Sequence, residues 1–176
     1  MYTTANVVVC AVVTDSFGNI WTSGHYGSNG GIINVYNLGT SEGSAPVTLP
    51  TSTQAGGCGF VVKYDSSGVA LLALQLATTN QTNSHICAAI AVDNLDNIYI
   101  GGTYGATAVL DIKNMSTTGG NASGITLPSF GARRPFIFKM NNAGVILSSS
   151  VVFWDSVNGE RGGVNNMTFD TLGNLW

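Results

Sequence analysis

Charged side chains are scarce in this chain of 176 residues, of which lysine, arginine, aspartate and glutamate make up only 9%. An average soluble protein has about 25%. The formal net charge is −3, and of the six basic residues only Arg133 and Arg134 are adjacent. A nucleic-acid-binding surface needs clustered positive charge, so we expect no nucleic acid partner.

Long apolar runs are also missing. A membrane-spanning helix needs about 18 or more consecutive apolar residues, and the run at residues 7–13 has seven. No basic segment precedes that run, so we interpret it as a buried strand and not as a signal peptide. The sequence predicts no membrane span, and no signal peptide is visible in this segment.

Few residues have the chemistry of metal or catalytic sites. Three cysteines, Cys10, Cys58 and Cys87, are an odd number at spacings that fit no metal motif. We expect them to be buried free thiols, with a bridge between Cys10 and Cys87 as the alternative. Neither His25 nor His85 belongs to a recognisable base–acid–nucleophile set. We therefore predict no catalytic residue, no cofactor and no enzymatic activity.

What the chain does contain is a repeat of about 77 residues. The segment that begins at Asp15 (DSFGNIW) returns at Asp93 (DNLDNIY) and at Asp170 (DTLGNLW). Self-similarity at a fixed period indicates units that bury their apolar faces against one another. The expected units are a first repeat at residues 1–85, a second at 86–163 and the start of a third at 164–176.

Each unit contains four stretches that alternate or run apolar, joined by turns rich in Asp, Asn and Gly. The expected strands are 6–14, 19–26, 59–64 and 69–76 in the first repeat, and 86–92, 97–104, 135–140 and 145–152 in the second. The stretches 27–58 and 105–134 each add a short hairpin, which we expect to project from the sheet as the partner-contacting surface. Gly18, Asp96 and Gly173 share one turn position, where we expect a positive φ.

An all-β fold follows, and tandem four-stranded antiparallel meanders with an inserted hairpin are typical of β-propeller blades. The chain would form a partial propeller. A β-solenoid usually has shorter repeats, and tandem sandwiches would need a separate core in each small unit. Two blades alone expose apolar faces, so we expect residues 1–176 not to form a stable soluble monomer.

The pattern Asp-x-x-Gly-Asn-Ile-Tyr/Trp, Gly-x-Tyr, then Phe-Val-Val-Lys-Tyr-Asp-x-x-Gly resembles the SBBP family of bacterial-type propeller repeats. It covers residues 10–76, 86–152 and 164–176, and departs from the family at Asp96 and Asn141. Such repeats occur on bacterial surface and secreted proteins and in large DNA viruses. The resemblance implies a non-enzymatic structural or binding module on a virion or cell surface, whose partners are other protein chains.

Two other functions remain open at this point. A lectin-like propeller would bind carbohydrate or another ligand through aromatic side chains, and a hydrolase or lyase propeller would have its catalytic residues outside this segment. As candidate ligand or partner contacts we take the repeated Tyr26 and Tyr104 and the adjacent Arg133 and Arg134.

The repeated Asp15, Asp93 and Asp170 are weak candidates for a calcium site, since the turns lack the alternating oxygen ligands of a calcium loop. We expect these carboxylates to accept hydrogen bonds from their own turns. Lys63 and Lys139 occupy matched positions in apolar strands, and we expect each to reach a carboxylate or carbonyl at the rim of its sheet.

Overall fold

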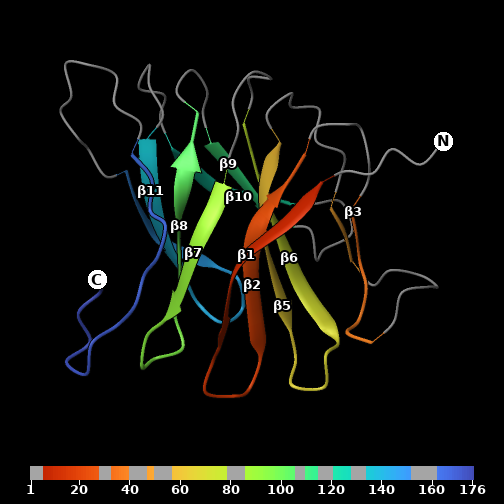
Figure 1. Ribbon diagram of the computed structural model, residues 1–176, viewed down its shortest axis with the longest axis horizontal. Coiled ribbons are helices and arrows are strands. Elements are labelled where there is room, and N and C mark those ends of the chain that lie inside the picture. Colours follow the sequence, from red (N-terminus) through yellow and green to blue (C-terminus); the bar gives the residue numbers. More distant parts are fainter. Residues whose placement is uncertain are drawn as a thin grey trace.

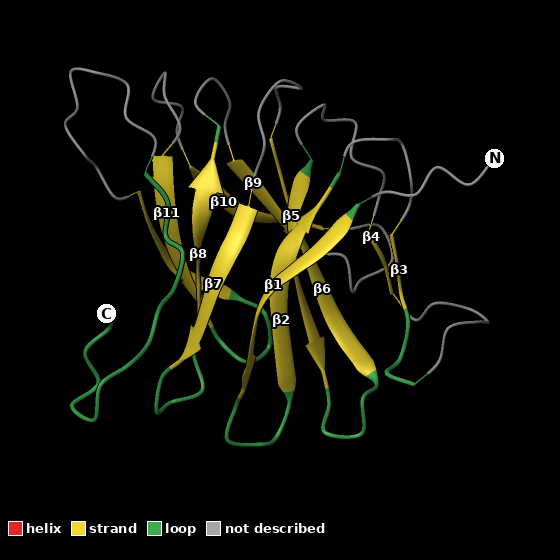
Figure 2. Ribbon diagram, viewed as in Figure 1, coloured by secondary structure: helices red, strands yellow, loops and turns green. Residues whose placement is uncertain are grey.

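The computed structural model describes residues 6–27, 33–39, 47–49, 57–78, 86–105, 110–114, 121–127, 134–151 and 162–176. These ranges contain β-strands in antiparallel sheets and no helix (Figures 1 and 2), which confirms the all-β prediction. Within them, no helix has the length and apolar character needed to cross a membrane.

The main strands of each repeat form one sheet, as predicted, and each begins and ends within two residues of its expected bounds. In the first sheet the order is β1-β2-β5-β6, and in the second it is β12-β11-β8-β7. The strands are β1 (Val7–Thr14), β2 (Ile20–Tyr26), β5 (Cys58–Tyr64), β6 (Ala70–Thr78), β7 (Ile86–Val92), β8 (Ile98–Tyr104), β11 (Arg134–Met140) and β12 (Ile146–Val151).

Both repeats also share an irregularity that the sequence alone does not reveal. The register of β1 against β2 shifts between Val9 and Ala11, and that of β7 against β8 shifts between Cys87 and Ala89. The extra residues, Cys10 and Ala88, are 78 positions apart. Because the β-bulge is present in both copies, it is a structural feature of the repeat unit.

Each sheet has two faces, which we name from equivalent residues. The front face carries Val12, Phe60 and Val62 in the first sheet and their equivalents Ile90, Phe136 and Phe138 in the second. The back face carries Trp21 and Val61 in the first sheet and Tyr99 and Ile137 in the second.

The main core lies between the back face of the first sheet and the front face of the second. Trp21, Ile98, Ile100, Phe136 and Phe138 are fully buried in it. Full burial of side chains of this size stabilises the fold by roughly 1.5–3 kcal/mol each. Stacked repeats thus share one core, as the repeat pattern predicted.

The inserted segments do form hairpins. They are β3 (Ile33–Val35) with β4 (Val47–Leu49), and β9 (Leu110–Asn114) with β10 (Asn121–Leu127). In the second repeat, however, β9 pairs with β6 and extends the first sheet to six strands.

The prediction that this hairpin projects as a free surface is therefore wrong. Ile112 is fully buried and Leu127 nearly so, both in the main core. The error has a physical reason: β6 has a free edge that the backbone of β9 completes, and this pairing joins segments more than 30 residues apart.

The strand nature of residues 7–13 is confirmed, but their predicted burial is wrong. Val7, Val8, Val9 and Val12 in β1 are 43–64% exposed. An apolar run identifies a strand without telling whether anything covers it.

Candidate functional site

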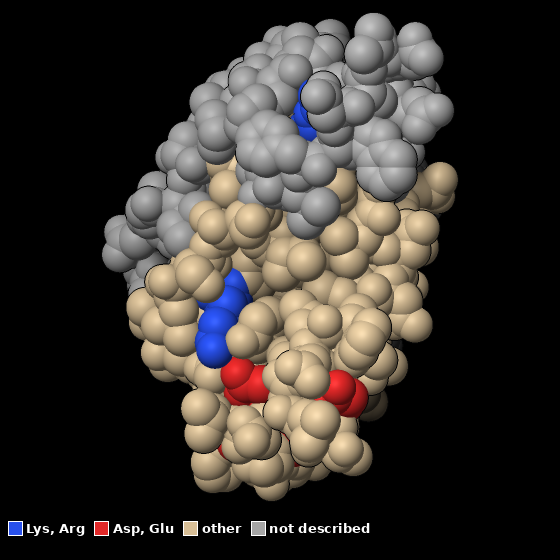
Figure 3. All heavy atoms as spheres, turned by 90° about the vertical axis from the view of Figure 1, so that its left-hand side faces the viewer, with Lys and Arg blue, Asp and Glu red and all other residues tan. Residues whose placement is uncertain are grey.

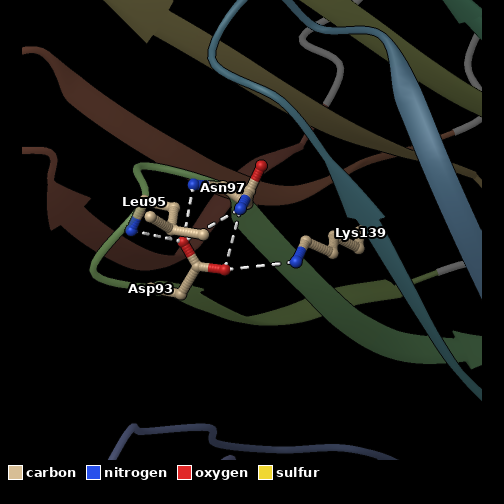
Figure 4. Close-up of polar contacts among 4 residues, drawn as sticks. All are labelled: Asp93, Leu95, Asn97 and Lys139. Carbon is tan, nitrogen blue, oxygen red and sulfur yellow. Dashed lines mark hydrogen bonds and ion pairs between the residues drawn. The ribbon is translucent and has the colours of Figure 1, made fainter. Parts of the chain in front are cut away.

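The repeated aspartates close their own turns. In Figure 4 the Oδ1 of Asp93 accepts the backbone N–H of Leu95 and of Asn97, each at 2.9 Å, while Lys139 approaches Oδ2 at 3.2 Å. Asp15, Asp65, Asn141 and Asp170 accept the same pair of backbone N–H groups two and four residues further on. This confirms the structural interpretation of the repeated carboxylates.

The shared turn position behaves as predicted. Gly18, Asp96 and Gly173 have φ values of 77°, 59° and 83°. A left-handed backbone is costly for most residues with a Cβ, and aspartate is among those that tolerate it. The Asp/Gly alternation in the sequence is thereby explained.

A polar junction links the two repeats where Asn142 of the second enters the first. Asn142 donates from Nδ2 to Asp15 Oδ2 at 2.7 Å, and its backbone carbonyl accepts from Lys63 Nζ at 2.9 Å. The Asn142 side-chain oxygen also accepts from Lys63. In the second repeat, Lys139 contacts Asp93 directly, with no such residue between them. Both lysines reach a rim oxygen, as predicted.

These contacts set the charge state of the aspartates. Burial acts to raise the pKa of Asp15, but hydrogen bonds from Asn19, Trp21 and Asn142 outweigh it and lower the pKa to about 2. For Asp170 the donors are Asn174 and Trp176, and they too lower the pKa to about 2. Carboxylates held this way are ionised, and their oxygens are occupied by these donors.

Metal binding gains no support from this geometry. In the described ranges, no group of three or more His, Cys, Asp or Glu side chains is placed to hold an ion. Asp15, Asp93 and Asp170 each stand in a separate turn, and their oxygens accept hydrogen bonds from that turn. Their remaining contacts are to neighbouring side chains: Trp21 and Asn142 for Asp15, Lys139 for Asp93 and Trp176 for Asp170.

Of the four candidate contact residues, Tyr26 and Tyr104 are fully buried. Each belongs to a core cluster that includes residues of its own hairpin, so neither side chain is placed to touch a ligand or partner in this structure. Arg134 is half-buried beside Tyr104 in the β11–β8 pair. Arg133 lies outside the described residues.

One pair that the sequence does not suggest is Cys10 with His25. The bulge brings the Cys10 sulfur to 3.6 Å from His25 Nδ1. Burial raises the pKa of Cys10 and lowers that of His25, so the neutral thiol and neutral imidazole are favoured. A nucleophilic cysteine needs the opposite shifts. Cys58 and Cys87 are buried, as predicted, whereas Cys10 is exposed, so its predicted burial is wrong; none of the three forms a disulfide bond.

The strongest candidate for a functional surface is the front face of the first sheet. A groove of about 280 Å³ opens between this face and the β3–β4 hairpin. Its lining is mostly apolar: Val7, Val9, Thr22, Ile33, Asn34, Val35, Tyr36, Leu38, Leu49, Phe60, Val62 and Tyr64.

Equivalent front-face residues of the two repeats differ sharply in the exposed fraction of their side chains. Val9 is 60% exposed, whereas Cys87, at its position in the second repeat, is fully buried. Val12 is 64% exposed and its equivalent Ile90 only 6%. The back face of the first sheet covers the second repeat at these positions, while none of the described residues covers the first repeat there.

The back face of the second sheet is covered in the corresponding way. Val164, Met167, Phe169 and Leu175 pack over Ala89 and Ala91, with Phe169 edge-on to Tyr99 at 5.0 Å between ring centroids. Met167 and Leu175 are the third-repeat equivalents of Ile90 and Ile98. The back face of one repeat thus packs against the front-face residues of the next repeat twice along the chain, an arrangement that we call front-to-back packing.

Charged residues are few on one side of the surface as well. Figure 3, seen from the side of β11 and the C-terminus, shows a described surface made up mostly of uncharged residues. β1 carries no charged residue, so its edge offers a partner apolar and hydrogen-bonding groups and no charged patch.

No known family model matches this chain, and no curated protein matches it.

Proposed function

We propose that this chain is a non-enzymatic structural module that joins other protein chains through the front face and the β1 edge of its first sheet. The observation that carries the proposal is the contrast between Val12 and Ile90, which are 64% and 6% exposed at the same position of the repeat. Apolar positions that one copy of a unit buries and another leaves open are typical of an interaction surface.

A β-propeller of the SBBP type is the architecture that we propose for the complete assembly. Two features support it: each repeat contributes a four-stranded meander, and front-to-back packing recurs from the first repeat to the second and from the second to residues 164–175. The remaining blades come from other repeats of the same kind.

The proposed setting is a virion or cell surface. Its support is the composition: few charges, a net charge of only −3, and 23 glycines among many Ser, Thr and Asn residues. Such a chain suits a scaffold whose contacts are apolar faces and backbone edges.

Sedimentation velocity of the full chain tests the proposal. We expect assembly that grows with concentration, and we expect Val12→Asp to abolish it, because a carboxylate at an apolar interface pays a desolvation cost. Leu95→Asp is the matched control, since Leu95 is 77% exposed in the turn between β7 and β8 and is not part of the first sheet. A wild-type chain that stays monomeric at all concentrations, or an assembly that Val12→Asp leaves intact, would contradict the proposal.

A further inference from the structure

Gly68 and Gly144 occupy the same place in the two repeats, 76 residues apart. Each is the fourth residue of the turn that joins the third and fourth main strands, and their φ values are 84° and 80°. The two turns are closed by the same set of hydrogen bonds, to Asp65 in one and to Asn141 in the other. Both glycines are buried, so the residues that cover them can be compared directly.

A leucine covers each glycine, but the two leucines come from different parts of the chain. A Cβ built on Gly144 would lie 2.4 Å from Leu72 Cδ1, in β6 of the neighbouring repeat. A Cβ built on Gly68 would lie 2.8 Å from Leu38 Cβ, in the segment that follows β3 of the same repeat. Because the built Cβ leaves both turns in the same direction, Leu38 takes at the first repeat the place that Leu72 takes at the second.

The segment 36–39 is attached to this turn by two backbone hydrogen bonds. Leu38 donates its backbone N–H to the Gly68 carbonyl at 2.7 Å, and Asn37 Oδ1 accepts the backbone N–H of Ala70 at 2.9 Å. The Leu38 side chain is nevertheless 52% exposed, whereas Leu72 is 7% exposed in the main core. Leu38 is therefore a less complete cover than the leucine of a neighbouring repeat.

We infer that segment 36–39 is a displaceable cap: a repeat of the same kind docks on the front face of the first sheet by moving Leu38 aside and placing its own leucine, equivalent to Leu72, over Gly68. This inference rests on the proposed docking function and names the partner and its contact. The precedent lies within the chain, where Leu72 of one repeat meets Gly144 of the next. Leu38 also borders the groove over the front face, so its displacement opens the groove to the incoming sheet.

The partner has to carry an apolar residue at the position of Leu72. In the second sheet the equivalent residue is Ser148, which is exposed. A serine there would bring a hydroxyl to Gly68 and lose its hydration without an apolar contact in return. Of the two repeats in this chain, the first is therefore the better match, and an added copy of it is the appropriate probe.

An elongated chain provides the test. Residues 1–84 joined directly to residues 7–176 keep the repeats in phase, because Val7 and His85 are 78 residues apart. Leu72→Ala in the added repeat should lower the thermal unfolding midpoint by about 5–15 °C, since docking buries that side chain. Leu71→Ala in the added repeat is the matched control: Leu71 is 46% exposed, and its replacement should shift the midpoint by less than about 2 °C.

The same chain shows whether the cap moves. In the natural chain, Leu38→Ala should lower the unfolding midpoint by about 2–4 °C, because it uncovers Gly68. In the elongated chain, Leu38→Ala in the repeat that follows the added one should leave the midpoint unchanged. There the leucine of the added repeat covers Gly68 instead.

These shifts separate the inference from the proposed function. If Leu72→Ala in the added repeat lowers the midpoint and Leu38→Ala no longer does, the inference is supported. If both lower it, a repeat docks while the cap stays in place, so the inference is overturned and the docking function stands. If Leu72→Ala in the added repeat has no effect, no repeat docks on this face and both proposals fail. A natural chain whose midpoint does not respond to Leu38→Ala also overturns the cap.

Discussion

Asp96 of the second repeat holds Ser16 of the first: its carboxylate accepts the Ser16 backbone N–H at 2.8 Å and the Ser16 hydroxyl at 2.6 Å. Asp96 stands at the position that is glycine in the other repeats and has a φ of 59°. The residue therefore combines backbone strain with a contact between repeats, and its replacement tests which of the two dominates.

Asp96→Gly should change the free energy of unfolding by less than about 1 kcal/mol, because relief of the left-handed backbone offsets the lost hydrogen bonds. The sequence alone predicts a neutral or stabilising change, since it does not reveal Ser16. Urea denaturation of Ser16→Ala, Asp96→Gly and the double variant measures the coupling. We expect Ser16→Ala to lower the free energy of unfolding by about 0.5–1 kcal/mol in the natural chain, and not to change it in a chain that already carries Asp96→Gly. If Ser16→Ala lowers it equally in both backgrounds, the contact between Ser16 and Asp96 is contradicted.

The β9–β10 hairpin should prove essential to the fold. Ile112→Ala and Leu127→Ala each remove a side chain from the main core, and we expect each to lower the free energy of unfolding by about 2–4 kcal/mol. Thermal unfolding measures this. Val145→Ala, at a 56% exposed position, is the control and should cost less than about 1 kcal/mol. Full stability after removal of residues 107–132 would show that the hairpin is peripheral after all.

Stability should fall in acid because of Asp15. Its pKa is about 2 in the folded chain against an ordinary value of 3.8, so the unfolded chain takes up this proton first as the pH drops. The stabilisation is present above about pH 4 and is lost between pH 4 and 2; it amounts to about 2 kcal/mol. Asn142→Ala removes one donor and should raise the Asp15 pKa, as measured by NMR titration. An unchanged titration would contradict the junction.

Gly101 should control how residues 162–176 sit on the second sheet. A Cβ built on Gly101 would lie 2.5 Å from Val164 Cγ1 and 3.1 Å from Met167 Cε, so Gly101→Val should displace the segment. Hydrogen exchange should then accelerate at Thr168 and Trp176, whose backbone groups bond each other. Gly27→Ala is the control, since its nearest neighbour would lie at 3.8 Å. Unchanged protection in Gly101→Val would contradict this packing.

Local chemistry explains which parts of this structure the sequence predicts. Asp and Asn turns and period-two apolar patterns act within a few residues, so the eight main strands and the positive φ of Asp96 could be predicted. The pairing of β9 with β6 joins Leu76 to Ile112, and no local pattern specifies that partner. Nor does apolarity distinguish Val12 from Ile90, because the difference lies in what covers each residue.

The same limit applies to the functional surface. Tyr26 and Tyr104 attract attention because they repeat, but they repeat as core residues. The groove and the β1 edge emerge only when equivalent positions are compared in space. In a repeat protein, equivalent residues that differ in burial indicate an interaction surface, and this difference is visible in the structure but not in the sequence.

The concentration dependence of unfolding tests the central claim most directly, because a partner that binds only the folded chain stabilises it by mass action. We expect the unfolding midpoint of the natural chain to rise with protein concentration and that of Val12→Asp to stay constant, at the value of the dilute natural chain. Ile90→Asp, the same change at the buried equivalent, should cost about 3–5 kcal/mol or prevent folding at every concentration. A natural chain that unfolds cooperatively at one midpoint across all concentrations, at the mass of a monomer, would contradict the claim that its first sheet is a docking surface.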